Sequence, residues 1–148
     1  MSGELTIRPY SDADRERVVA VWLESGLREY TYLPRFQSLD QTQAESIFER
    51  IEAASTVWVA CYDELVVGYL AMQGSYIDRL YVHPDHQAQG IGTQLLRFAK
   101  SRSPMGLQLH THVQNVNARK TDERCGFNAV RFSLSPAPEC VPDVEYRW

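Results

Sequence analysis

The chain has 148 residues and a mass of 17.0 kDa, with a formal net charge of −4 and a pI near 5.5. Its 44% hydrophobic and 23% charged residues are ordinary for a globular domain with a full core. It has no basic run and no apolar run of ~20 residues, which argues against nucleic-acid binding and against a membrane span. The opening MSGELTIRPY lacks the regions of a secretory signal, and the three cysteines lack Cys-x-x-Cys spacing. We therefore expect free thiols, no metal and a cytoplasmic location.

The predicted elements alternate in type along the chain. Residues 5–10 alternate as a strand, Ser11 starts a helix with Asp14 as its capping-box partner, and a second helix is predicted from Asp40 to Ala54. The remaining predicted elements are strands at 56–62, 65–72 and 76–82, a helix to about Ser103, a strand at 106–113, a short helix at 117–124, a strand at 127–134 and an edge strand at 143–148. The order β-αα-βββ-α-β-α-ββ predicts one mixed α/β domain over residues 1–148, with a central mixed sheet flanked by helices.

A glycine-rich turn interrupts this pattern in LYVHPDHQAQGIGTQLL, residues 80–96. Gly90 and Gly92 fall at the start of a predicted helix, where unpaired N–H groups and the positive end of the macrodipole favour an anion. A Walker A loop would need a lysine after the glycines, and Gly92 is followed by Thr93. A dinucleotide fingerprint would need a third glycine near Leu95 and an early place in the chain. Neither motif fits.

A third anion-binding pattern does fit. Gln87-Ala88-Gln89-Gly90-Ile91-Gly92 matches Gln/Arg-x-x-Gly-x-Gly/Ala, the pyrophosphate loop of the GNAT superfamily of N-acetyltransferases. Asn115-Val116-Asn117-Ala118, followed by Gly126-Phe127, resembles a second segment of that family. The resemblance implies acetyl-CoA as the donor and a primary amine of a small molecule, amino acid or peptide as the acceptor. The sequence leaves open whether the protein forms a homodimer. The resemblance also implies that the first two helices shape the acceptor pocket, so we expect the aromatic segment REYTYLPRF, residues 28–36, to act as its lid.

The resemblance also assigns the residues that hold the donor. The pantetheine arm is expected beside Leu80, Tyr81 and Val82, and the backbone N–H near Val82 is expected to donate to the thioester oxyanion. Asn115 and Ala118 are expected to contact the cofactor arm, although Asn115 could instead only form a turn. The pyrophosphate is expected on the backbone amides of Gln87, Ala88, Gln89, Gly90, Ile91, Gly92 and Thr93.

Acetyl transfer needs a base, because amines are protonated at neutral pH. In the strand at 106–113, His110 falls on the face opposite Leu107 and Leu109, where some family members carry a glutamate base. A histidine, with an ordinary pKa of ~6.5, suits this role, although a solvated histidine without function fits the pattern too. Asp78 is the second candidate, with an ion pair to Arg79 as the alternative reading. The sequence leaves His110, Asp78 and water open as the base.

The expected general acid is missing. Where the family commonly has a tyrosine facing the sulfur, this chain has Asp122. We expect an ionised aspartate there, unable to donate a proton unless burial raises its pKa strongly, and little loss of turnover on its removal. Tyr30, Tyr32 and Tyr81 are possible substitutes that the sequence does not rank. This departure keeps open a rival reading, a non-catalytic acyl-CoA-binding module of the same fold.

Overall fold

The structure of the chain is a computed structural model and describes residues 3–148; residues 1–2 of the predicted domain lie outside it. The predicted order of elements is confirmed, with a short helix added between the two predicted N-terminal ones. The elements are β1 (Leu5–Pro9), α1 (Arg15–Glu29), α2 (Pro34–Gln37), α3 (Gln41–Ala54), β2 (Thr56–Tyr62), β3 (Leu65–Gln73), β4 (Tyr76–Val82), α4 (Ile91–Arg102), β5 (Gln108–His112), α5 (Val116–Arg124), β6 (Asn128–Leu134) and β7 (Pro142–Arg147), with short 3-10 turns at Asp12–Asp14 and Pro84–His86.

The helix starts follow local hydrogen bonds that the sequence encodes. The carboxylate of Asp40 accepts from the backbone N–H of Gln43 at 2.8 Å, and the Gln43 side chain accepts from the Asp40 N–H at 3.0 Å. The Ser11 N–H likewise donates to Asp14 at 2.9 Å, and Asp14 closes the 3-10 turn just ahead of α1. These reciprocal bonds satisfy backbone donors that a helix start would otherwise leave free.

The strands form one seven-stranded sheet in the order β1-β2-β3-β4-β5-β7-β6. The β4–β5 pair is parallel, and every other neighbouring pair is antiparallel. The prediction of β7 as an edge strand is wrong: it lies between β5 and β6, and four of its six residues are buried. Its run Val144 to Tyr146 needs cover on both faces, whereas β6 is exposed along its whole length and forms the edge.

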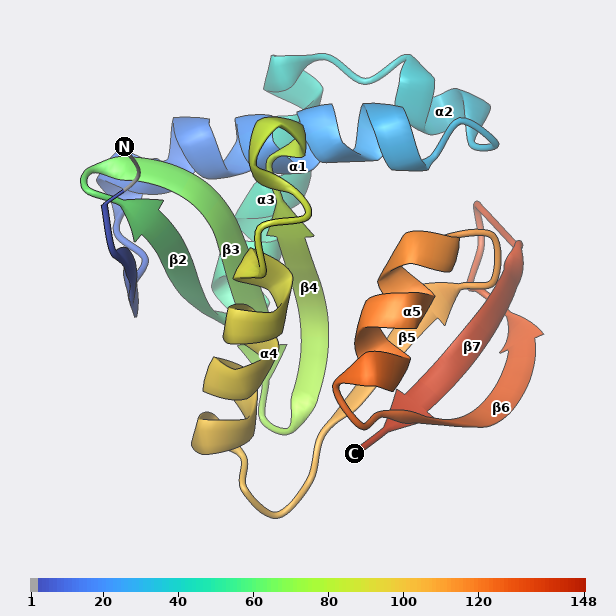
Figure 1. Cartoon of the computed structure of the whole chain (residues 1–148). Helices are drawn as coiled ribbons and strands as arrows, with labels where there is room; N and C mark the ends of the chain where they lie inside the picture. The colour runs from blue at the N-terminus through green and yellow to red at the C-terminus, as the bar shows by residue number, and fades with distance from the viewer. Residues whose placement is uncertain (1–2) are drawn as a thin grey trace.

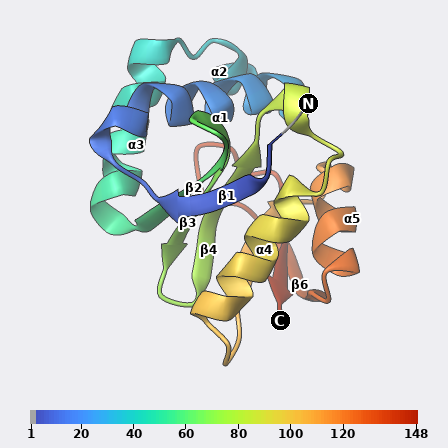
Figure 2. The same ribbon diagram turned by 60° about the vertical axis from the view of Figure 1, so that its left-hand side comes forward.

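Helices cover both faces of the β1–β4 half of the sheet, as Figures 1 and 2 show. On one face, α4 packs Ile91, Leu95 and Leu96 against Val67 and Leu70 of β3. On the other face, α1 and α3 pack against alternate residues of the same strands; this second cluster includes Val18, Val21, Trp22, Phe48, Val59, Tyr69 and Ala71. The predicted pyrophosphate loop, residues 87–93, leads into α4 and is called the donor loop below. This loop and the aromatic segment after α1 therefore begin on opposite faces of the sheet.

The sheet opens between β4 and β5. These two strands share only two residue pairs, Tyr76 with Gln108 and Ile77 with Leu109. The partners of Ala71 and Met72 on β3 are Arg79 and Ile77, so Asp78 is one extra residue in β4, a β-bulge. A bulge bends its strand and increases the local twist. Beyond Asp78 the two strands diverge, which is visible in Figure 1 as β4 and β5 part on either side of α5.

Candidate active site

The start of α4 presents free backbone donors. Gly90 is the N-cap residue, adopts a left-handed conformation with φ of 83°, and offers no side-chain cap. The N–H of Gln94 donates to the Gly90 carbonyl. It is the first N–H of this helix with a backbone acceptor in the described chain. The N–H groups of Ile91, Gly92 and Thr93 precede it. A Cβ added at Gly90 would meet nothing within 4 Å, so the space in front of these donors is open. This arrangement fits a phosphate group.

The open edge of β4 continues from that helix start. The N–H of His83 donates to Val67 on β3 at 2.8 Å. Because successive residues of a strand point their backbone groups in opposite directions, those of Leu80 and Val82 point away from β3 and toward β5. The side chain of Gln87 donates to the Val82 carbonyl at 3.0 Å on this same side. The N–H groups of Leu80 and Val82 therefore face the gap where β4 and β5 separate.

A cleft of about 750 Å³ joins these features. It runs from the donor loop, along the open edge of β4, to the aromatic segment that follows α1. Of the predicted donor-binding residues, all except Gln89 line it. Those that do are Leu80, Tyr81, Val82, Gln87, Ala88, Gly90, Ile91, Gly92, Thr93, Asn115 and Ala118.

Asn115 has a structural task as well as a place in the cleft. Its side-chain oxygen accepts from the N–H of Ala118 at 3.4 Å and makes Asn115 the N-cap of α5. This is the turn-forming role that the sequence left as the alternative. Its side-chain amide keeps its donors for another partner, since the described chain offers it no acceptor within hydrogen-bonding distance.

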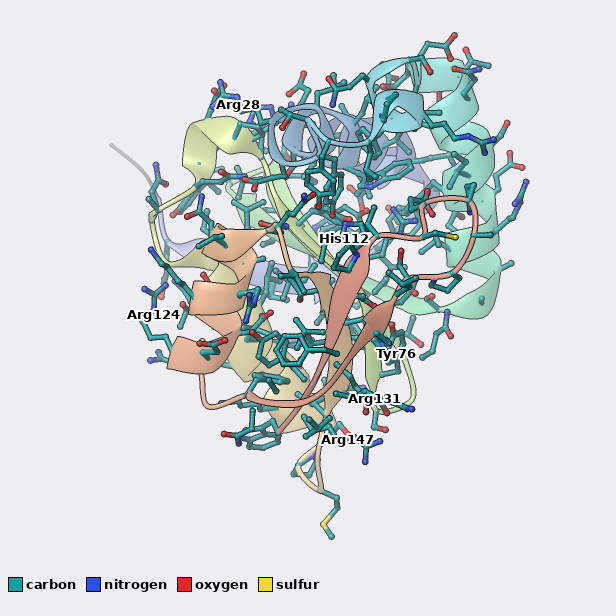
Figure 3. The ribbon with its side chains drawn as sticks, turned by 90° about the vertical axis from the view of Figure 1, so that its right-hand side faces the viewer. Arg28, Tyr76, His112, Arg124, Arg131 and Arg147 are labelled. Atoms are coloured by element: carbon teal, nitrogen blue, oxygen red, sulfur yellow. The ribbon has the colours of Figure 1, made fainter. Side chains whose placement is uncertain are left out.

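His110 projects from β5 toward β4 on the side opposite α4. Its Nδ1 lies 3.1 Å from the hydroxyl of Tyr76, and its Nε2 lies 3.9 Å from Glu145. Glu145 is bonded more closely by Arg147, at 2.7 Å. The residue lines the cleft, and its side chain keeps 34% of its exposure, so water reaches the ring. Tyr76 and its neighbours Arg131 and Arg147 lie on the face shown in Figure 3.

His112 is a residue whose importance the sequence analysis missed. Its Nδ1 lies 2.8 Å from the Tyr32 hydroxyl, and its ring packs 5.5 Å from that of Tyr30. Burial lowers the pKa of His112, which keeps the ring neutral at neutral pH. Figure 3 shows it near the end of the strand where the N-terminal helices approach. The alternation that placed it beside His110 was a signal for it, but the contact with Tyr32 depends on the tertiary fold.

Asp78, the other predicted base, is the bulged residue itself. Its Oδ2 is buried without a hydrogen-bond partner in residues 3–148 and lies 3.9 Å from the Arg79 Nε. The predicted contact with Arg79 is therefore present but long. The residue also lines the cleft, one position before the open edge of β4 begins.

Asp122 meets the condition that the sequence set for a proton donor, because it is buried. The residue is 7% exposed, on the face of α5 that packs over β5, and it accepts a hydrogen bond from the Thr111 hydroxyl at 2.9 Å. Burial raises the pKa of Asp122 to about 7, although the Thr111 bond opposes the shift. Asp122 also lines the cleft. An aspartate in this setting holds a proton near neutral pH and can donate it.

Among residues 3–148, no three or more His, Cys, Asp and Glu side chains are grouped as they would be around a metal ion. None of the helices described here has the length and apolar character to cross a membrane.

Comparison with known proteins identifies the family of this chain. The family model described as an acetyltransferase (GNAT) domain matches residues 53–129, which include β4, the donor loop, α4 and α5. The chain belongs to the GNAT acetyltransferases. This membership confirms the predicted family, and with it the predicted enzyme class, an acetyl-CoA-dependent N-acetyltransferase.

Individual relatives agree with the family assignment. The peptidyl-lysine N-acetyltransferase YjaB of Salmonella typhimurium is 27% identical over 124 residues, covering 83% of each chain. The solution structure of apo YjaB from Escherichia coli superposes with a TM-score of 0.82 at 22% identity, covering 98% of this chain and 97% of that one, and so confirms the predicted fold. The structure of yncA from Salmonella typhimurium with acetyl-CoA is similar in fold, with a TM-score of 0.73 at 16% identity, covering 97% of this chain and 92% of that one.

Proposed function

We propose that this GNAT enzyme moves the acetyl group of acetyl-CoA directly to a primary amine of a small molecule, amino acid or peptide. The observation that carries the proposal is the continuity of two sets of free backbone donors. The N–H groups at the start of α4 lead to those of Leu80 and Val82, all along one cleft. An extended pantetheine arm attached to a pyrophosphate has that shape and those acceptors. The peptidyl-lysine activity named for YjaB supports a primary amine as the acceptor.

The donor and acceptor are proposed to enter from opposite faces. The donor loop lies on the α4 face, whereas Tyr76, His110 and the aromatic segment 28–36 lie on the face of α1. The two reactants then meet in the gap between β4 and β5. We assign the oxyanion contact to the backbone N–H groups of Leu80 and Val82, because they point into this gap.

In the proposed step the amine nitrogen forms a bond to the acetyl carbon, and the carbon–sulfur bond breaks. His110 accepts the proton that the amine loses, either directly or through water in the cleft. Asp122 supplies a proton to the departing thiolate, because its burial keeps the carboxyl partly protonated. These assignments replace the missing tyrosine by an aspartate held in position by Thr111.

A coupled assay of free CoA thiol, run with acetyl-CoA and a panel of amines, amino acids and peptides, tests the proposal. The proposed enzyme releases CoA only when an acceptor is present, and mass spectrometry finds one acetylated acceptor per CoA released. A protein that binds acetyl-CoA, as shown by calorimetry, yet releases no CoA above the uncatalysed rate with any acceptor would be the binding module.

A further inference from the structure

Arg79 is a half-buried cation without a close carboxylate partner, in the part of the cleft that faces α1. Its side chain keeps 18% of its exposure, and its guanidinium lies 4.4 Å from the centre of the Trp22 ring. The nearest carboxylate, Asp78, is 3.9 Å away, too far for a hydrogen bond. The Tyr69 hydroxyl lies beside the guanidinium, and no carboxylate of residues 3–148 comes closer to it than Asp78. Arg79 and Trp22 both line the cleft.

A group of this kind is costly unless something pairs with it. Removing a charge from water is unfavourable, and a guanidinium has five N–H donors in a planar fork. The Tyr69 hydroxyl beside the guanidinium is buried and makes no hydrogen bond of ordinary geometry within residues 3–148, and burial raises the pKa of Tyr69. The Trp22 ring fixes the plane of the guanidinium without using its N–H groups. One hydroxyl cannot satisfy five donors, so the fork is positioned in advance for a further acceptor in the cleft.

The position and charge of Arg79 indicate which chemical group would accept its hydrogen bonds. Arg79 precedes Leu80, whose N–H faces the proposed transfer point, so an anion on Arg79 lies within a small molecule's length of it. A carboxylate matches the fork with two parallel hydrogen bonds. A dianion such as a phosphate monoester would be repelled by Asp78 and Glu29, which line the same space. The site therefore favours a single negative charge.

We infer that the acceptor amine carries a carboxylate, as an amino acid does, and that Arg79 binds this carboxylate while the amine faces the gap between β4 and β5. The inference deepens the proposed function and rests on it for the direction of the amine. It makes Arg79 a specificity-determining residue for the acceptor. The donor does not use it, because the donor loop and the N–H groups of Leu80 and Val82 lie elsewhere in the cleft.

Binding of reaction products tests this without requiring turnover. N-acetyl amino acids with small, apolar, aromatic and basic side chains are titrated into the CoA-loaded enzyme beside their carboxamides, which lack the charge. We expect the best-bound acid to bind about tenfold or more tightly than its amide, as a charge-assisted pair would give. Arg79→Met should reduce that ratio to near one, and Arg79→Lys should keep part of it.

Arg102→Met is the matched control, because Arg102 also lies over a tryptophan, Trp58 at 5.4 Å, but outside the cleft. It should leave the ratio unchanged. Equal binding of acids and amides, no binding of any acid, or a preference that survives in a folded Arg79→Met would overturn the inference. Carboxylate binding through Arg79 in a protein that releases no CoA would instead uphold the inference and refute the proposed function.

Discussion

The hydroxyl of Thr111 donates a hydrogen bond of 2.9 Å to the carboxyl of Asp122, joining β5 to α5 inside the cleft. The contact matters because Asp122 is otherwise surrounded by protein, and burial raises its pKa to about 7. Thr111 and the covering helix thus hold in place a carboxyl that is partly protonated at neutral pH.

Asp122→Asn keeps a side chain of the same shape but cannot release a proton. We expect turnover to fall by about ten- to a hundredfold, in the lower range for one acid–base group, with acetyl-CoA affinity unchanged. Steady-state kinetics and calorimetry measure the two quantities. Turnover within twofold of the wild type would show that the thiolate leaves unaided.

The same substitution has a predicted effect on stability. A carboxyl with a higher pKa in the folded than in the unfolded state binds its proton more tightly when folded, so the free energy of unfolding falls as the pH rises from about 4 to about 7. Asp122→Asn removes this pH-dependent loss of stability, because the amide does not titrate. We expect the variant to be more stable than the wild type by about 2 kcal/mol at pH 8, with the difference shrinking toward pH 4. Thermal unfolding across this range measures it, and a constant difference would contradict the assigned pKa.

Gly90→Glu should abolish the rise in melting temperature that acetyl-CoA causes, because the new side chain occupies the open space before α4 and repels the pyrophosphate. Gly74→Glu is the matched control. Gly74 also has a positive φ and open space around it, but lies in the turn between β3 and β4, outside the cleft. If folded Gly90→Glu responded to acetyl-CoA as fully as Gly74→Glu, the pyrophosphate site would lie elsewhere.

Gly26 in α1 sets the position of the aromatic segment. A Cβ at this residue would overlap the ring of Phe36 in α2, so the two helices approach each other closely only because residue 26 is glycine. An Ala normally stabilises a helix by ~1 kcal/mol relative to Gly. Here we expect Gly26→Ala to lower stability and to raise the KM for the acceptor several-fold, with donor binding unchanged.

The double variant Gly26→Ala, Phe36→Leu relieves the overlap, so it should recover part of the lost stability. A Gly26→Ala variant as stable as the wild type, with unchanged KM for the acceptor, would show that the segment does not depend on this contact.

His110→Ala should lower turnover by ~10²-fold or more, because the His110 ring is open to water and lines the cleft. Asp78→Asn should lower turnover much less, because the Oδ2 atom of Asp78 is buried. Tyr76→Phe removes the hydroxyl that orients His110 and should give an intermediate loss. Kinetics at saturating acetyl-CoA distinguishes the three. Full activity in His110→Ala would transfer the role to Asp78 or to water.

The sequence was sufficient for whatever depends on local pattern. Strand alternation, the cap at Ser11, the helical spacing after Asp40 and the glycines before α4 were enough to predict the order of the elements and the glycine turn. The bulge at Asp78 was not predictable, because it follows from the register with β3. The place of β7 inside the sheet and the burial of Asp122 likewise depend on contacts between distant segments. The sequence predicted the ordinary aspartate, and the fold changes its protonation.

Transfer of the acetyl group in this cleft is tested most directly by following the acetyl group itself. Isotopically labelled acetyl-CoA is incubated with the acceptor panel and wild-type enzyme, with Gly90→Glu and Gly74→Glu in parallel, and acetylated amines are quantified by mass spectrometry. We expect labelled N-acetyl product from the wild type and from Gly74→Glu, in proportion to the CoA released. Gly90→Glu should form much less of this product. Label that stays on CoA with every acceptor, or appears equally with Gly90→Glu, would contradict this prediction.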